Sequence, residues 1–337
     1  MKKKFILLLV GILVIIPFGG CADKEDTPIG MAVEFMDHAA CAYISQDKGW
    51  YEEEGLELAA YESYATGMAL ASALARGDIE VAYVCLVPAI NAYANAGVDI
   101  KIVAGTHKYG YALVVDPEKV SSVEDLEAEG IRIGCVREGG AVDIVLNKVL
   151  DGYDVDGDAI LSKVQRMNPP KQLLAIQSGQ LDAAFLPEQW ATMAEEFGFE
   201  VMVMAQDVWP EMQGSVLVVK QQLIDEEPEA VRSLIRVSRK ATEWICQNPE
   251  EAAEIMAREL TAISEGIFPV EVAALAAQLE ITESALLTSM ARMEYTLDID
   301  VAEVQKMIDY LAELGYISSS FDANEILDLS FLEDELD

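Results

Sequence analysis

Two stretches of the chain share one pattern, YESYATGMALASALARGDIEVAYV at residues 61–84 and KVQRMNPPKQLLAIQSGQLDAAFL at residues 163–186. Superposed without a gap, they align Thr66 with Asn168, Gly77 with Gly179 and Glu80 with Asp182. In each stretch a polar residue suited to cap a helix precedes about three helical turns, and a glycine and a short apolar run follow. The pattern predicts a helix and then a strand. Because the unit occurs twice, we expect two similar α/β lobes.

Outside the repeats, apolar runs of strand length alternate with helical segments. We expect further strands at residues 31–36, 56–61, 100–105, 111–115, 131–136, 201–205 and 214–219. Strands that alternate with helices favour parallel pairing with right-handed crossovers. The runs at 111–115 and 214–219 follow a change in pattern, and they predict two connections between the lobes.

These connections divide the chain. We expect lobe 1 at residues 29–109, lobe 2 at 110–212, and a return to lobe 1 at 213–337. From Pro228 onward the sequence is helical, and a typical helix start is Asn248 before Pro249. We expect the C-terminal helices to pack on lobe 1.

The N-terminus has the pattern of an export signal. A charged start precedes an apolar run at residues 5–18, which is too short to span a bilayer. Two glycines then precede Cys21, an arrangement that resembles a lipoprotein processing site. We expect an export signal at 1–20, lipidation of Cys21 and a linker at 21–28. The alternative is an uncleaved signal anchor, and in both cases the rest of the chain lies outside the cytoplasm.

The formal net charge of the chain is −36. This charge argues against nucleic acid as a partner, because a polyanion would be repelled. An acidic surface of this kind indicates adaptation to solubility in salt, and the alternative is a cation-binding function. A site for an anionic solute would need backbone donors at short range, with salt screening the distant carboxylates.

Beyond Cys21, four cysteines are scattered along the chain: Cys41, Cys85, Cys135 and Cys246. They form no CxxC motif and have no histidine cluster near them in sequence. The spacing indicates neither a zinc site nor a disulfide framework, so we expect no metal and no cofactor. Apolar neighbours predict that these cysteines are buried small hydrophobes.

The ends of the predicted strands mark the expected site. In doubly wound sheets the carboxyl ends of strands face the crevice, where helix N-termini present unpaired N–H groups. Thr66–Gly67 and Gly139–Gly140 suit a small anion, because short side chains let the solute reach these amides. Arg137 adds a guanidinium that can bind a sulfonate or carboxylate through two hydrogen bonds.

Five segments together carry a family resemblance: HAACAYISQDKGWYEEEGL at 38–56, LARGDIEVAY at 74–83, SVEDL at 122–126, SGQLDAAF at 178–185 and PEQWA at 187–191. In this order, behind an export signal, they resemble the solute-binding proteins of ABC importers in the nitrate, sulfonate, taurine and thiamine-precursor group. The resemblance implies a two-lobe α/β fold of the periplasmic-binding-protein type II, with a two-strand hinge. It also implies a protein that closes on its solute and delivers it to a permease driven by an ATPase, with no chemistry on the solute.

The resemblance, combined with the strand ends, gives a set of expected ligand-binding residues: His38, Thr66, Gly67, Cys85, Leu86, Arg137, Gly139, Gly140, Asn168, Glu188 and Trp190. Several have an alternative structural role. Thr66 is also a suitable helix cap, and Arg137 can pair with Glu138. His38 can be a turn residue, and Trp190 either stacks on the solute or belongs to the core.

The solute is expected to carry an oxyanion, as in alkyl sulfonates, nitrate or bicarbonate. Acidic residues at the same rim, Asp37, Glu138 and Glu188, favour a taurine-like zwitterion within this group. The alternative solute is an aminopyrimidine thiamine precursor, with Trp190 or Tyr109 stacked on the ring. Two other classes are an enzyme on the same fold and a surface sensor without a permease. The chain has an export signal and only two histidines, which argues against the enzyme; we expect a monomeric binding protein.

Overall fold

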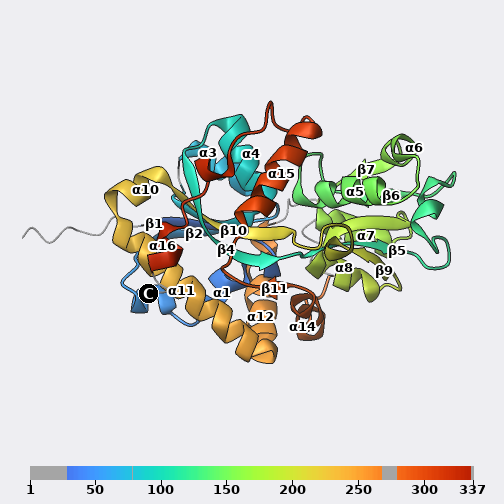
Figure 1. Ribbon diagram of the computed structural model, residues 1–337. Coiled ribbons are helices and arrows are strands. Elements are labelled where there is room, and N and C mark those ends of the chain that lie inside the picture. Colours follow the sequence, from blue (N-terminus) through green and yellow to red (C-terminus); the bar gives the residue numbers. More distant parts are fainter. Residues whose placement is uncertain (1–28, 78, 268–278, 335–337) are drawn as a thin grey trace, which may run out of the picture.

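The computed structural model describes residues 29–77, 79–267 and 279–334. Within these ranges the chain forms two α/β lobes, each built around one sheet, and the green segment on the right of Figure 1 is lobe 2. The expected export signal, the lipidated Cys21 and the linker lie outside the described residues. Among the described helices, none is both long and apolar enough to cross a membrane.

The sheet of lobe 1 has the strand order β11-β4-β10-β3-β1-β2. Its strands are β1 (Ile29–Glu34), β2 (Leu58–Tyr64), β3 (Val81–Cys85), β4 (Ile100–Lys108), β10 (Gln213–Lys220) and β11 (Glu294–Tyr295). Strand β1 pairs in parallel with β2 and β3, whereas β10 is antiparallel to β3 and β4. The strand after the second connection therefore returns to the centre of the first sheet.

The sheet of lobe 2 has the order β7-β6-β8-β5-β9. Its strands are β5 (Tyr111–Val115), β6 (Ile133–Cys135), β7 (Val164–Arg166), β8 (Ala183–Pro187) and β9 (Glu200–Met204). Strand β5 is antiparallel to β8 and β9, as β10 is to β3 and β4. The order β2-β1-β3-β10-β4 thus corresponds strand by strand to β7-β6-β8-β5-β9, and the prediction of two similar lobes is confirmed.

The repeated sequence unit forms α3 (Gly67–Arg76) before β3 and α7 (Pro169–Gln177) before β8. Thr66 Oγ1 accepts a hydrogen bond from Ala69 N, and Asn168 Oδ1 accepts one from Lys171 N, so both polar residues cap their helices. Gly77 ends α3 with φ 99°, a left-handed conformation that glycine adopts without strain.

The aligned carboxylates of the repeat also have one role. Glu80 Oε2 accepts from Gly30 N of β1 at 2.7 Å, and Asp182 Oδ2 accepts from Arg132 N beside β6 at 2.9 Å. Each carboxylate therefore ties the start of the strand in its unit to the start of the neighbouring parallel strand.

Helices cover the sheets of both lobes. They are α1 (Ala40–Asp47), α2 (Trp50–Glu53), α4 (Leu86–Ala96), α5 (Ala141–Gly152), α6 (Gly157–Leu161), α8 (Glu188–Glu195), α9 (Ala205–Val208), α10 (Gln221–Glu226), α11 (Pro228–Gln247), α12 (Pro249–Ile267), α14 (Glu283–Ala291), α15 (Val301–Glu313) and α16 (Ser330–Asp334). Short 3-10 turns η1 (Asp37–Ala39), η2 (Val123–Glu127) and η3 (Ala323–Glu325) complete the order.

Two chain crossings form the hinge between the lobes. Tyr109 N, after β4, donates to Met212 O, before β10, at 3.0 Å, so the crossings lie side by side. Tyr109 and Gly110 both have positive φ, 67° and 92°, which turns the chain from one sheet into the other.

The C-terminal helices were expected on lobe 1, where α11 and α12 pack, and the structure adds contacts between this segment and lobe 2. Helices α11 and α12 pack on α1 of lobe 1, but α14 contacts both α12 and α8 of lobe 2 (Figure 1). Tyr310 of α15 likewise donates to Asp151 of α5 in lobe 2. The C-terminal segment therefore supports both lobes.

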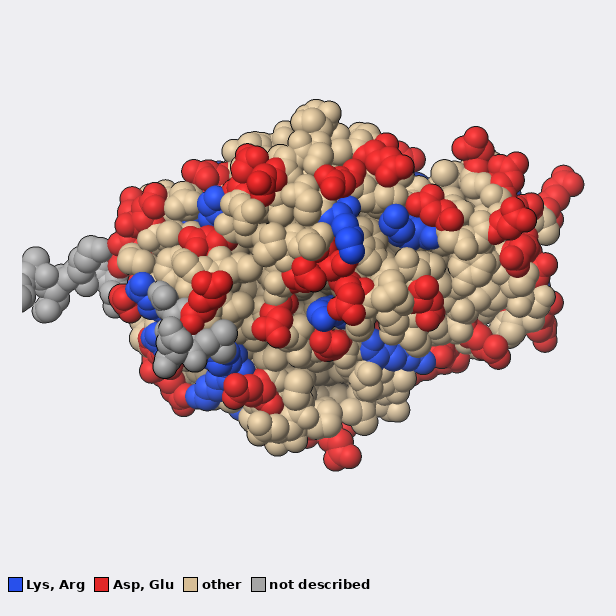
Figure 2. All heavy atoms as spheres, viewed as in Figure 1, with Lys and Arg blue, Asp and Glu red and all other residues tan. Residues whose placement is uncertain are grey.

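Cysteine burial follows the prediction at three positions. Cys41, Cys85 and Cys135 are buried, whereas Cys246 is exposed because it lies on the solvent side of α11. Figure 2 shows carboxylates spread over the face in view and fewer cationic side chains among them, in keeping with the net charge of −36.

Candidate functional site

A cavity of about 290 Å³ lies between the two lobes. Six of the expected residues line it: Thr66, Gly67, Cys85, Arg137, Gly140 and Asn168. Its remaining wall is mostly apolar and includes Met36, Met68, Pro88, Val136, Val142, Met167, Pro169 and Pro187. Glu34, Tyr111 and Arg166 add polar groups that the sequence analysis did not include.

The other expected residues lie outside the cavity lining. Trp190 packs in the core, with its ring centroid 6.4 Å from that of Phe35. Leu86 is buried at the start of α4. Gly139, with φ 74°, lies against the ring of Tyr316 in a separate surface cleft.

Two of the carboxylates that were expected at the rim of the site, Glu188 and Asp37, bind other side chains instead. Glu188 is buried and accepts from Arg292 at 3.0 Å, and burial raises its pKa although the guanidinium opposes the change. Asp37 accepts from Ser289, and burial raises its pKa to about 7. Neither carboxylate lines the cavity.

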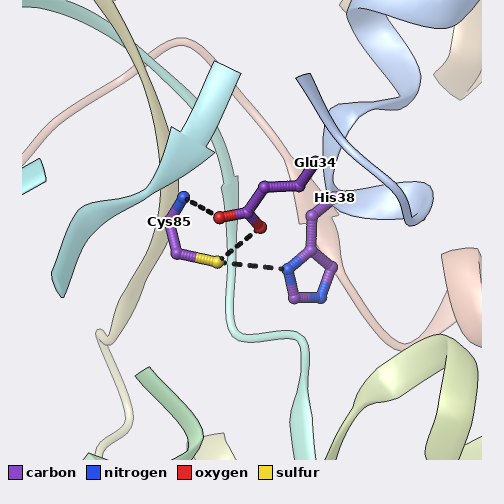
Figure 3. Close-up of side chains that lie close together, drawn as sticks. All are labelled: Glu34, His38 and Cys85. Carbon is purple, nitrogen blue, oxygen red and sulfur yellow. Dashed lines mark hydrogen bonds between the residues drawn. The ribbon is translucent and has the colours of Figure 1, made fainter. Parts of the chain in front are cut away.

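Glu34 is the carboxyl group that reaches the cavity. It ends β1, has 1% exposure, and accepts from Cys85 N at 3.0 Å and from the Cys85 thiol at 2.9 Å (Figure 3). Burial raises the pKa of Glu34 to about 7, and the two Cys85 hydrogen bonds oppose that increase. The group is therefore poised between its neutral and charged forms near neutral pH.

Gly67 makes room for Glu34. A Cβ atom at position 67 would lie 2.1 Å from Glu34 Oε1 and 2.7 Å from Pro88 Cγ. The carboxyl group thus occupies the space where a side chain of α3 would begin. This is a steric reason for glycine here, different from the anion contact that the sequence indicated.

His38 lies behind Cys85, away from the cavity lining. Its Nε2 is 2.8 Å from Gly110 O, and its Nδ1 is 3.7 Å from Cys85 Sγ (Figure 3). A carbonyl oxygen only accepts, so Nε2 carries the hydrogen and Nδ1 presents a lone pair to the thiol. Burial and the neighbouring His107 lower the pKa of His38, which keeps the ring neutral.

Donors for an anion come from two helix starts and from two arginines that line the cavity, Arg137 and Arg166. Thr66 and Gly140 precede α3 and α5 at the cavity wall, and first-turn amides of such helices favour negative charge. Arg166 lines the same wall but already donates to Asp143 and to Val136 O.

Little in the sequence singles out the added polar residues. Glu34 is the one charged residue in the apolar run MAVEFM at 31–36, which is a usable signal. Arg166 and Tyr111 carry no comparable signal, because their proximity to Glu34 depends on how the two sheets face each other.

Comparison with known proteins agrees with this architecture. The two-lobe architecture is that of the periplasmic-binding-protein fold. The structure superposes on the alkanesulfonate-binding protein SsuA of Xanthomonas axonopodis pv. citri, bound to MOPS, with a TM-score of 0.71 at 14% identity, covering 89% of this chain and 98% of that one. The periplasmic nitrate-binding protein NrtA of Synechocystis PCC 6803 gives a TM-score of 0.74 at 14% identity, covering 92% and 88%.

Sequence comparison gives the family. Residues 22–260 match the model of the NMT1-like family, and the chain belongs to that family. A Brucella abortus protein that is named as a candidate binding protein is 27% identical over 267 residues, which are 77% of this chain and 79% of the relative.

Proposed function

We propose that the protein is the solute-binding component of an ABC-type import system, capturing a small organic solute between its two lobes. The observation that carries this proposal is the cavity at the lobe interface, lined from both lobes and reached by a buried carboxyl group, Glu34. The family and the fold of the nitrate and sulfonate binders support it.

The cavity chemistry favours a solute with an amino group on an apolar body. Glu34 can accept from an amine or pair with a cation, whereas it would repel a bare anion once it is ionised. Methionine, proline and valine account for eight of the nineteen lining residues and offer an apolar surface to the solute. Nitrate and bicarbonate offer neither an amine nor such a surface.

Two solute classes from the sequence analysis meet this requirement. An aminopyrimidine would place its amino group at Glu34 and its ring between the methionine and proline side chains, since Trp190 and Tyr109 do not line the cavity. A taurine-like aminosulfonate would also use Arg137, Arg166 and the starts of α3 and α5. The apolar wall favours the aminopyrimidine, so we propose it first.

Binding rather than catalysis is the role that the cavity supports. The thiol in the wall belongs to Cys85, and burial together with the neighbouring Glu34 raises its pKa well above the usual value. A thiol that stays protonated is a poor nucleophile.

The location, oligomeric state and partners of the protein are proposed from its sequence. We propose that the protein is a monomer lying outside the cytoplasm, anchored through a lipid on Cys21, and partnered by a permease and its ATPase. We also propose that lobe 1 comprises residues 29–109 and 213–337 and lobe 2 residues 110–212.

Titration calorimetry of the purified protein tests the solute class. The panel is aminopyrimidines, taurine, alkyl sulfonates without an amine, nitrate and bicarbonate. We expect binding of an amino-bearing compound, and a loss of about tenfold or more in affinity for Glu34→Gln, equal to about 1.4 kcal/mol. Glu57→Gln, at an exposed position, is the matched control. Binding of nitrate or a simple sulfonate with unchanged affinity in Glu34→Gln would refute the amino-bearing class.

A further inference from the structure

We propose that Glu34, His38 and Cys85 form a binding site for a divalent cation of the zinc class, with its open coordination position toward the solute cavity. The three residues come from β1, η1 and the end of β3, and no sequence motif connects them. Their potential ligand atoms lie within 4.8 Å of one another, and all three residues are buried (Figure 3).

The distances suit a tetrahedral ion. Zinc bonds of about 2.3 Å to sulfur and about 2.0 to 2.1 Å to nitrogen or oxygen place neighbouring ligand atoms about 3.6 Å apart. The distance from Cys85 Sγ to His38 Nδ1 is 3.7 Å. The distance from Sγ to Glu34 Oε2 is 2.9 Å, so the carboxylate would move outward by about 0.7 Å, and Glu34 lines the cavity on that side.

The histidine is already oriented as a metal ligand. Its Nε2–H donates to Gly110 O at 2.8 Å, which leaves the Nδ1 lone pair directed at Cys85. Metal-bound histidines characteristically donate their other ring N–H to a carbonyl or carboxylate in this way. The Cys85 backbone N–H likewise holds Glu34 Oε1 at 3.0 Å.

The charges of the cluster also fit. A divalent cation with one thiolate, one carboxylate and one neutral imidazole has no net charge, which lowers the cost of burying the ion. Binding releases the thiol proton of Cys85, and the proton of Glu34 when that group is neutral. The soft thiolate and the imidazole favour zinc over magnesium or calcium.

Three protein ligands leave one coordination position for water or a solute atom. Glu34 and Cys85 line the cavity and His38 lies behind them, so this position faces the solute. The inference goes beyond the proposed transport role and concerns the same Glu34 carboxylate. An ion bound there would occupy this carboxylate, so cation binding and an amine contact at Glu34 are alternative states of the site.

Cobalt and zinc titrations test the site. The purified protein is stripped with a chelator, reduced, and titrated with Co²⁺ in high salt and excess Mg²⁺, which suppress weak binding to the acidic surface. We expect one equivalent to bind and to produce a thiolate-to-cobalt absorption band that one equivalent of Zn²⁺ removes. His38→Gln should bind about 100-fold more weakly, at the upper end of the loss caused by removing groups that only orient ligands.

Cys85→Ser should abolish the absorption band, and Cys246→Ser, at the exposed cysteine, should retain it. Thermal unfolding of each variant checks that the fold is intact. A wild-type protein that binds no stoichiometric Co²⁺, or a band that persists in Cys85→Ser, would overturn the metal site. Calorimetry with solutes in excess chelator tests solute binding separately from metal binding. A protein that binds solute in this experiment but no Co²⁺ in the titration would refute the metal site and leave the proposed function intact.

Discussion

At the scale of single residues, the Glu34 carboxyl group depends on Gly67, because it fills the space that a side chain at position 67 would take. Replacement of Gly67 by alanine would place a methyl group 2.1 Å from Glu34 Oε1, so the carboxyl group must leave its position beside Cys85. We expect Gly67→Ala to lower the free energy of unfolding by about 1 to 3 kcal/mol and to weaken solute binding about tenfold or more. Denaturant unfolding and calorimetry measure both effects.

Gly266→Ala is the control for Gly67→Ala, because a Cβ atom there has nothing within 4 Å. Its free energy of unfolding should stay the same or rise by less than about 1 kcal/mol. Wild-type solute affinity in Gly67→Ala would show that the position of Glu34 does not matter for binding.

Glu34 also predicts a pH dependence of stability. Its pKa is about 7 in the folded protein against an ordinary value of 4.5, so between these values the folded state binds more protons than the unfolded state. Stability from this group is therefore complete below pH 4.5 and is lost as the pH rises through about 7, by up to about 3 kcal/mol in total.

The measurement is urea unfolding in the presence of a chelator across this pH range. Asp37 contributes in the same direction, so the difference between the wild type and Glu34→Gln isolates Glu34. The decrease with pH should be smaller in Glu34→Gln, and parallel curves for the two proteins would contradict the raised pKa.

The sequence predicted some of the residues that line the cavity, but it did not predict which of them contact one another. Thr66, Gly67, Gly140 and Asn168 could be predicted at the cavity because helix starts at strand ends have a recognisable pattern. The contact between Glu34 and Cys85 could not be predicted, because it joins residues 51 positions apart through the pairing of neighbouring strands.

At the scale of elements, the repeated helix and strand were predictable because local signals agree. A cap, an apolar helical face, a glycine stop and an apolar strand all occur within 24 residues of each repeat, at 61–84 and 163–186. The second strand was less well placed, at 56–61 in the prediction and at Leu58–Tyr64 in the structure. Its pattern is weak because β2 is an edge strand with a partly exposed face.

The contact between α14 and α8 joins the C-terminal segment to lobe 2. Arg292 pairs with Glu188, whose side chain is 2% exposed, and with Glu195. Removing the guanidinium would leave a buried carboxylate without its counter-ion. We expect Arg292→Met to lower the free energy of unfolding by about 3 kcal/mol, measured in denaturant.

The double variant Arg292→Met with Glu188→Gln should recover most of this loss, because no unpaired charge remains. Glu53→Gln breaks an exposed ion pair with Lys240 and should cost less than about 0.5 kcal/mol. If Arg292→Met costs no more than this control, the pair does not stabilise the packing of α14 on α8.

At the scale of the whole molecule, the two-lobe arrangement followed from the repeat and the family resemblance. Neither the repeat nor the resemblance predicted that the C-terminal segment packs on both lobes. Residues after α15 are fixed to lobe 1, where Ile102 N donates to Ile326 O at 2.8 Å, yet Tyr316 donates to Asp143 of α5 in lobe 2. Helical periodicity shows which face of a helix is apolar and does not show which lobe covers it.

Tyr316 predicts an effect on lobe closure. Its hydroxyl reaches Asp143 Oδ2 at 2.5 Å, and a hydrogen bond to a charged group is worth about 1.5 to 3 kcal/mol. If the bond breaks when the lobes separate, Tyr316→Phe should reduce the closed population and weaken solute binding about tenfold. Calorimetry and small-angle X-ray scattering with and without solute measure these changes.

Tyr153→Phe is the control for Tyr316→Phe, because Tyr153 is 36% exposed on lobe 2. It should bind and scatter like the wild type. An unchanged affinity and radius of gyration in Tyr316→Phe would mean that this bond plays no part in closure.

The paired prolines at the start of α7 have a consequence for how a solute enters. Pro169 and Pro170 have no amide hydrogen, so this helix cannot offer the donors that α3 and α5 offer. Backbone donors at the cavity wall therefore come from the starts of α3 and α5, whereas the start of α7 contributes the apolar ring of Pro169. A guest molecule with one polar and one apolar end would therefore be bound in a single orientation.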